Sequence, residues 1–199
     1  IFRILGNIIM FEGAIMLLPF LVSLIYKEHT AIYFIITAAV AIAIGYILAN
    51  LKTENRHIYA KEGFIIVALS WVVVSLVGAL PFYISGEIPN YIDAFFETVS
   101  GFTTTGSTIL NDIEALSRGM LFWRCFTHWI GGMGVLVFVL ALIPKSEGQD
   151  MFLMKAEVPG PVVGKLVSKV HMTARILYGI YAFLTVIEII FLLFGGMPL

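Results

Sequence analysis

Residues 91–108 read YIDAFFETVSGFTTTGST and decide the architecture of the chain. The first part, Tyr91–Phe102, places apolar side chains at a helical spacing. Asp93 lies in its first turn, where a carboxylate complements the helix dipole. At about 1.5 Å per residue this helix is roughly 18 Å long, about half a membrane. Gly101 offers a natural helix stop, and poor helix formers follow from Thr103 onward.

A half-length helix followed by extended backbone predicts a re-entrant loop. Irregular backbone at membrane depth is tolerated only where it is buried in protein or lines a watery cavity, so the loop predicts a pore. Extended backbone at Thr103–Gly106 can point successive carbonyl oxygens at one axis and replace the hydration shell of an ion. Gly106 can adopt backbone angles closed to other residues and leaves that axis uncrowded. Ligation by oxygen alone suits a hard alkali cation.

The composition of the whole chain places this loop in a membrane. Of 199 residues, 60% are apolar and 13% are charged, and the mean hydropathy is +0.99. The charged fraction is about half that of a soluble domain, which excludes a cytoplasmic globular enzyme, a disulfide scaffold and a disordered tail. The net charge of −1 leaves no basic field for nucleic acid. The single cysteine, Cys125, has no internal partner for a disulfide.

Five apolar stretches are long enough to cross a bilayer, which takes about 20 residues. They are Ile4–Tyr26, Ala31–Ala49, Gly63–Gly86, Cys125–Pro144 and Ile176–Leu199. Two connections are basic and are expected on the cytoplasmic side: one carries Lys52, Arg56 and Lys61, and the other carries Lys145, Lys155, Lys165, Lys169 and Arg175. The connection 84–119 holds Arg118 against five acidic residues and is expected outside. The N-terminus is then cytoplasmic, and the loop enters from outside.

Several longer motifs resemble one family of membrane proteins. SGFTTTGSTIL (100–110) and WRCFTHWIGGMGVLVFVLALIP (123–144) are similar to segments of the Trk/Ktr/HKT superfamily of potassium and sodium transporters. The similarity continues through AEVPGP (156–161) and ARILYGIY (174–181), so it covers most of the chain. Two spans before the first pore unit make it most similar to the TrkH branch.

The resemblance implies an all-α membrane fold of four span–pore-helix–span repeats with one filter strand per repeat. By that scheme residues 1–60 hold two N-terminal transmembrane helices, and 61–145 form the first complete repeat. Residues 146–172 are a cytoplasmic linker, and 173–199 are the first helix of a second repeat. One repeat cannot close a pore, and the chain begins at Ile1 without a methionine. We therefore expect it to be the N-terminal portion of a longer protein.

The resemblance also implies the transported ion and its site. Thr103, Thr104, Thr105 and Gly106 become the selectivity filter, and the carbonyls near Thr104 and Thr105 bind K⁺. Glycine at position 106 favours potassium, whereas serine there in some plant relatives accompanies sodium selectivity. No enzyme activity and no organic cofactor are expected.

The resemblance further implies the surroundings of the protein. We expect a multi-pass protein of the bacterial inner membrane, a homodimer of pore subunits, and a TrkA/KtrA-like nucleotide-binding regulatory subunit on the cytoplasmic face. Lys155, Lys165 and Lys169 are candidate contacts for that subunit. Transport that is channel-like and transport coupled to another cation both remain open.

Charged and polar residues within the spans allow two interpretations each. Arg124 either supports the pore by pairing with a carboxylate such as Glu97, or snorkels to the interface. His128 is better explained as a packed, hydrogen-bonded residue than as a ligand. Glu12 and Glu188 suit polar contacts between helices, with proton or ion coupling as the alternative. The set Gly131, Gly132 and Gly134 favours close helix packing over a hinge.

Three other functions compete with potassium uptake. A sodium-permeable member of the same superfamily has the same architecture. An intramembrane hydrolase would use Ser100 as nucleophile and His128 as base, but no oxyanion donor is evident and the threonine run stays unexplained. A purely structural membrane anchor leaves the half-length helix without a purpose.

Overall fold

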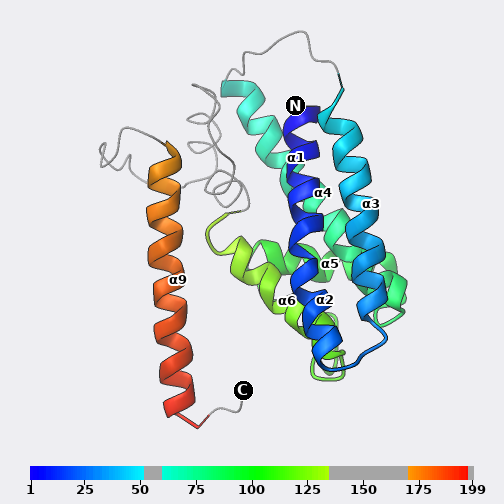
Figure 1. The fold of residues 1–199 in the computed structure, drawn as a ribbon, viewed down its shortest axis with the longest axis vertical. Coiled ribbons are helices and arrows are strands. Elements are labelled where there is room, and N and C mark those ends of the chain that lie inside the picture. Colours follow the sequence, from blue (N-terminus) through cyan, green and yellow to red (C-terminus); the bar gives the residue numbers. More distant parts are fainter. Residues whose placement is uncertain (52–59, 135–169, 197–199) are drawn as a thin grey trace.

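A computed structural model describes residues 1–51, 60–134 and 170–196, and over these ranges the chain is helical without any strand. This confirms the all-α prediction for the described part. Figure 1 shows α1, α3 and α4 running along the long axis, with α5 and α6 packed at the lower half and α9 set to one side. The helices are α1 (Phe2–Ile15), α2 (Leu17–Ile25), α3 (Ala31–Ala49), α4 (Ala60–Ser85), α5 (Tyr91–Phe102), α6 (Arg118–Gly131) and α9 (Val170–Phe194).

Four described segments are long and apolar enough to cross a membrane: Phe2–Ile25, Ala31–Ala49, Gly63–Ser85 and Met172–Phe194. They correspond to four of the five expected spans. The first is interrupted at Met16, between α1 and α2. Proline at position 19 explains the break, because its nitrogen cannot donate to the carbonyl of Ile15 one turn earlier.

The remaining expected span, Cys125–Pro144, is described only as far as Gly134. There the helix is α6, which begins at Arg118 and ends at Gly131. The helix thus begins before the apolar stretch does, and Arg124 lies in its interior rather than at its start. Residues 135–144 lie outside the described part, as do AEVPGP and Lys145, Lys155, Lys165 and Lys169.

Glycines bring α1 and α3 into backbone contact. A Cβ atom added to Gly45 would come within 2.6 Å of the Gly6 carbonyl oxygen, and one added to Gly13 within 3.0 Å of the Ala38 carbonyl oxygen. Small residues let helices approach closely where lipid offers no hydrophobic drive for association. The outer face of α3 exposes isoleucines such as Ile32, Ile36 and Ile47, as expected of a lipid-facing surface.

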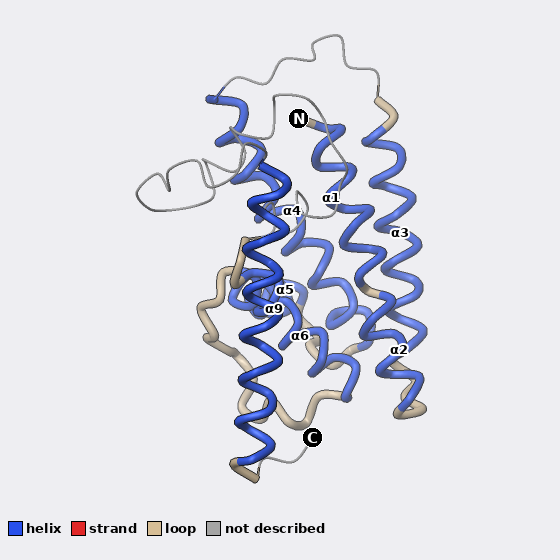
Figure 2. The backbone as a smooth tube through the Cα atoms, turned by 60° about the vertical axis from the view of Figure 1, so that its left-hand side comes forward, coloured by secondary structure: helices blue, strands red, loops and turns tan. Residues whose placement is uncertain are grey.

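The connection between α2 and α3 contacts the start of α6. The carboxylate of Glu28 accepts hydrogen bonds from the backbone N–H groups of Arg118, at 2.7 Å, and Gly119, at 3.0 Å. Glu87 accepts one from the Ser117 N–H at 3.0 Å. Two carboxylates thus cap α6, where the helix dipole favours negative charge. The connection 26–30 and the start of α6 therefore lie at the same end of the bundle, as Figure 2 illustrates.

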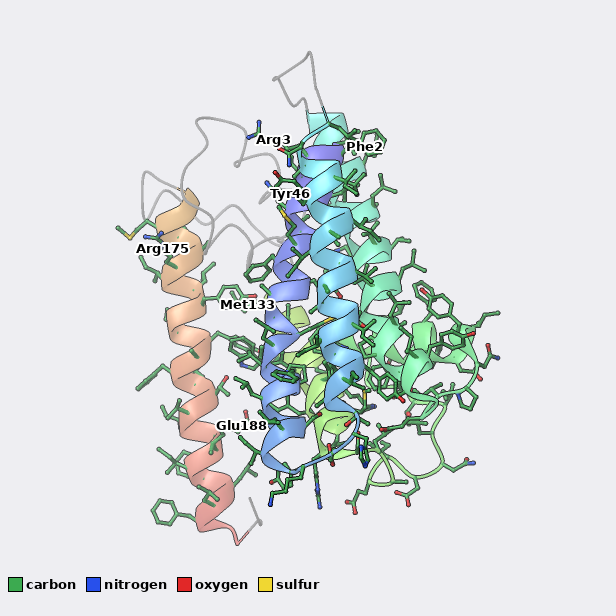
Figure 3. All side chains as sticks on the ribbon, turned by 45° about the vertical axis from the view of Figure 1, so that its right-hand side comes forward. Phe2, Arg3, Tyr46, Met133, Arg175 and Glu188 are labelled. Carbon is green, nitrogen blue, oxygen red and sulfur yellow. The ribbon has the colours of Figure 1, made fainter. Side chains whose placement is uncertain are left out.

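Aromatic side chains attach α9 to α6. The indole N–H of Trp129 donates to Thr185 at 3.1 Å, and Tyr181 stacks on the same indole at 5.4 Å between ring centroids. Most of the remaining surface of α9 is exposed and apolar. Figure 3 shows Arg3 and Arg175 toward one end of the molecule and Glu188 in the other half of α9. Glu188 is exposed.

Candidate functional site

The helix α5 has the bounds that its sequence predicts, Tyr91–Phe102. Asn90 caps its N-terminus, because its side-chain oxygen accepts from the Ile92 N–H at 3.0 Å while its own backbone stays extended. Tyr91 ties the same end to α4 through a hydrogen bond from its hydroxyl to the Leu76 carbonyl oxygen at 2.8 Å. The opposite end of α5 leads directly into the threonine run.

The threonine run turns tightly and does not begin as the extended strand that we predicted. Thr104 lies in the left-handed region with φ of 55°, and Gly106 follows with φ of 76°. The N–H groups of Thr105 and Gly106 both bond to the Ser100 carbonyl oxygen, at 2.9 and 3.4 Å. These bonds to the last turn of α5 curl the backbone, which corrects the prediction of an extended run from Thr103.

Hydroxyl groups stabilise this turn from within. Thr103 donates to the Val99 carbonyl oxygen at 2.7 Å, and its oxygen lies 2.8 Å from the Thr105 hydroxyl. Ser100 donates to the Ser107 carbonyl oxygen at 2.5 Å, which closes the loop onto α5. Residues 103–109 are all exposed, whereas Ser100 and Phe102 beneath them are buried. Residues 103–109, called the loop from here on, thus form a hydrogen-bonded, polar surface above the buried end of α5.

Glu97 links the loop, residues 103–109, to the two helices beside it, α5 and α6. It lies in α5 with its side chain fully buried. One carboxylate oxygen accepts from the Thr108 hydroxyl at 3.0 Å and from the Ile109 N–H at 3.2 Å. The other lies 2.6 Å from Nε of Arg124 in α6. One side chain therefore connects α5, the far end of the loop and α6.

Arg124 and Glu97 form the ion pair that the sequence suggested. The Arg124 side chain is 11% exposed, so it does not snorkel into solvent. An isolated charge buried at this depth is costly, and a geometrically good partner offsets that cost. Both charges of the pair are thereby accommodated next to the loop.

Close contact between α5 and α6 depends on glycines. A Cβ atom at Gly101 would overlap the Thr127 hydroxyl, and one at Gly131 would overlap the Phe102 carbonyl group. Gly132 faces the Tyr181 hydroxyl of α9 in the same way, within 2.5 Å. The packing role predicted for Gly131 and Gly132 is therefore confirmed. Gly134 differs, since it adopts φ of 85° after the end of α6.

The geometry does not support a serine hydrolase. The Ser100 hydroxyl donates to a carbonyl oxygen, and Nδ1 of His128 lies 2.9 Å from the Arg124 carbonyl oxygen within its own helix. Neither group is directed to the other as a nucleophile and base must be. His128 is hydrogen-bonded within the helix, as the sequence interpretation favoured.

Comparison with known proteins identifies relatives along nearly the whole chain. Residues 31–196 match the family model of TrkH, described as a cation transport protein. The chain is 43% identical to the Trk system potassium uptake protein TrkH of Salmonella typhimurium and 34% identical to TrkG of Escherichia coli, over 98% of its length in each case. It spans about 41% of those relatives.

A solved structure matches the fold as well. The crystal structure of the potassium transporter TrkH from Vibrio parahaemolyticus superposes with a TM-score of 0.77 at 32% identity. That match covers 100% of this chain and 40% of the other.

Proposed function

Because the chain belongs to the TrkH family of cation transport proteins, we propose that it forms part of a membrane pore for potassium uptake. Relatives that are 43% and 42% identical to the chain are named potassium uptake proteins, and the family consists of transporters rather than enzymes. In this proposal α5 is a re-entrant pore helix, and Thr103–Gly106 is the segment that binds and selects K⁺. The chain spans about 41% of the length of the Salmonella typhimurium relative. In this proposal, further segments of the protein form the remaining wall of the pore.

The bonding of Glu97 is the observation that supports this proposal most strongly. An ion-selecting loop must keep its shape, because selection depends on how its oxygens are placed. Glu97 holds the loop from the far side through Thr108 and Ile109, while Arg124 fixes Glu97 in turn. Residues 103–106 are exposed, so packing does not hold them. The bonds of Glu97 fix their position instead, as an ion-selecting loop requires.

The loop also has suitable chemistry for an alkali cation. Its surface offers hydroxyl and carbonyl oxygens at Thr104 and Thr105 and no basic group within residues 103–109. The C-terminal end of α5 lies directly behind it, and this end of a helix carries partial negative charge. A Cβ at Gly106 would meet nothing within 4 Å, so the residue leaves its surroundings open.

For the arrangement in the membrane, the proposal adopts what the sequence predicted. The N-terminus is cytoplasmic, and the connection 84–119 faces outward in the bacterial inner membrane. Residues 1–60 precede the first span–pore-helix–span repeat at 61–145, a linker covers 146–172, and 173–199 begin the next repeat. Partners are a second copy of the pore subunit and a TrkA/KtrA-like nucleotide-binding subunit.

Rubidium uptake with sodium competition tests the proposal. The full-length protein is expressed in cells that lack potassium uptake, and Gly106→Ser is compared with the parent. We expect uptake by the parent to resist sodium and uptake by Gly106→Ser to lose that resistance. A sodium-permeable transporter would instead show sodium inhibition in the parent as well.

Gly86 offers a matched control for this experiment. Gly86 has φ of 80° and open space where an added Cβ atom would lie. The control Gly86→Ser therefore introduces the same kind of backbone strain as Gly106→Ser. Gly86 lies just after α4, outside the loop. Unchanged selectivity in both variants would contradict a role for Gly106 in the filter.

A further inference from the structure

A second buried glutamate takes no part in the loop. Glu12 lies in α1 and is 5% exposed, and neither of its carboxylate oxygens has a hydrogen-bond partner among the described residues. The proposed function does not use this residue. A buried carboxyl group without any partner is unusual enough to require an explanation of its own.

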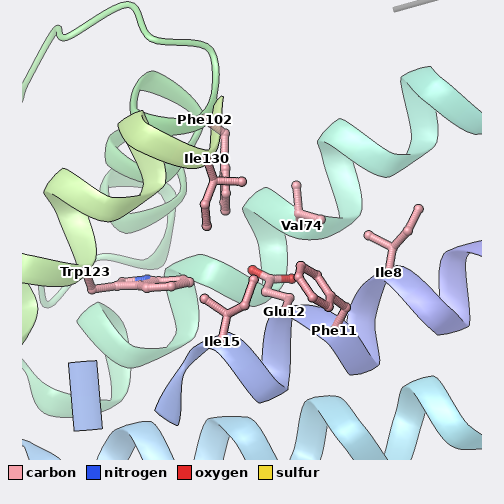
Figure 4. Close-up of a pocket in the computed structure, with 8 residues that line it drawn as sticks. All are labelled: Ile8, Phe11, Glu12, Ile15, Val74, Phe102, Trp123 and Ile130. Atoms are coloured by element: carbon pink, nitrogen blue, oxygen red, sulfur yellow. The ribbon is translucent and has the colours of Figure 1, made fainter. Parts of the chain in front are cut away.

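Glu12 borders a small, partly open cavity between α1 and the helices α4, α5 and α6. The cavity has a volume of about 20 Å³, which is room for about one water molecule. Figure 4 shows the carboxyl group at the centre of the residues that line it. Apart from Glu12 these are apolar or aromatic: Ile8, Phe11, Ile15, Val74, Phe102, Trp123 and Ile130.

Trp123 is the one residue with a side-chain donor among those that line the cavity, and this donor is already engaged. The indole N–H of Trp123 donates to the Gly78 carbonyl oxygen at 2.9 Å and is not available to Glu12. Gly78 itself makes room for the carboxyl group, because a Cβ added there would come within 3.0 Å of Glu12 Oε1. The site thus accommodates the carboxyl group by shape, and the part of the chain that the structure describes offers it no donor.

No described charged side chain compensates Glu12 from the helices that pack against α1. Nothing in α2 titrates, and the described side chains of α3 and α4 contribute only the tyrosines Tyr33, Tyr46 and Tyr83. The charged groups of α5 and α6 do not line the cavity. Among them, Glu97 and Arg124 pair with each other, and His128 bonds to its own helix.

These surroundings leave few ways to neutralise the carboxylate. An ionised carboxylate in an apolar site without a partner is strongly disfavoured. A metal cation needs several oxygen ligands, and the cavity supplies a single carboxyl group. A proton needs only one oxygen, and one water molecule in the cavity is sufficient to accept the resulting O–H.

We propose that Glu12 is a proton-binding site, held as a neutral carboxylic acid that donates to one internal water molecule. Phe102 lines the same cavity and directly precedes Thr103, so the bound proton lies next to the end of α5. The proposal concerns the charge state of Glu12 and stands or fails independently of potassium transport.

Infrared spectroscopy of the full-length protein in lipid vesicles tests this assignment. A protonated carboxyl group gives a carbonyl-stretch band that shifts in heavy water, whereas a carboxylate gives none. The measurement is made at about pH 7, well above the ordinary glutamate pKa of about 4.3. We expect this band in the wild type and its loss in Glu12→Gln. Glu188→Gln is the matched control, because Glu188 also lies in a candidate span but is exposed, and its removal should leave the band unchanged.

Either of two results would overturn the proposal. The first is the absence of a protonated-carboxyl band in the wild type at that pH. The second is a band that persists in folded Glu12→Gln. If the Gln variant does not fold, Glu12→Asp replaces it, and the band must then shift in frequency rather than stay where it is.

Discussion

The two buried glutamates in the described part of the chain, Glu97 and Glu12, lie in opposite kinds of environment. Glu97 accepts two hydrogen bonds at one oxygen and pairs with Arg124 at the other. Glu12 is nearly as buried, and neither of its oxygens has a hydrogen-bond partner in the described ranges. Burial therefore does not determine what a carboxyl group does; the partner set does. A fully bonded carboxylate fixes neighbouring segments in place, whereas an unpartnered one binds a proton.

Of the substitutions that test this contrast between Glu97 and Glu12, Arg124→Met should reduce stability the most. It leaves the Glu97 charge buried without its cation, a change that typically costs about 3–5 kcal/mol. We expect the free energy of unfolding in detergent to fall by about that amount and rubidium uptake to be lost. The double variant Arg124→Met with Glu97→Gln should recover part of the loss, because no charge remains unpaired. A stable Arg124→Met protein would contradict the role assigned to the ion pair.

Glu28→Ala should have an intermediate effect. The carboxylate of Glu28 caps α6 from a distant connection by accepting from the N–H groups of Arg118 and Gly119. Loss of a helix cap costs about 0.5–2 kcal/mol, and denaturant unfolding should show a decrease of that size. Glu114→Ala, an exposed carboxylate of the outer connection, is the control and should change stability much less. Equal effects would mean that the cap contributes nothing specific.

Glu12→Gln should have the smallest effect of the three. A neutral amide resembles a neutral carboxylic acid in size and charge and differs from it by one additional N–H donor. We therefore expect the free energy of unfolding at about pH 7 to change by about 1 kcal/mol or less, the size of one ordinary hydrogen bond. The same substitution at Glu97 removes a charge that pairs with Arg124 and should be clearly destabilising. A large loss in Glu12→Gln would indicate that the carboxylate charge itself is needed there.

Local sequence signals predicted α5 well and the loop after it only in part. The apolar spacing predicted the extent of α5, because it acts within a few residues. Gly101, the predicted stop, lies inside the helix instead, and the left-handed residue that follows the helix is Thr104. The turn at Thr104 depends on bonds to the Ser100 carbonyl oxygen, and threonine content alone favours an extended backbone instead. Composition indicates which side chains are polar, but not how the backbone folds back on a helix.

Distant contacts were predictable only where few partners exist. Charges in and next to the spans are rare, so Glu97 could be named as a candidate partner for Arg124, and the structure pairs the two. The cap that Glu28 places on α6 joins positions far apart in sequence, and no local pattern announces it. The cavity at Glu12 likewise depends on how four helices meet, so the sequence identified the carboxylate but not its lack of a donor.

The position of a bound ion tests the central claim most directly. Anomalous diffraction from crystals of the full-length protein grown in rubidium would locate that ion without any substitution. We predict rubidium beside the oxygens of Thr104 and Thr105, on the exposed side of the loop that Glu97 holds. Well-occupied rubidium elsewhere in the pore, with none at this loop, would contradict the account.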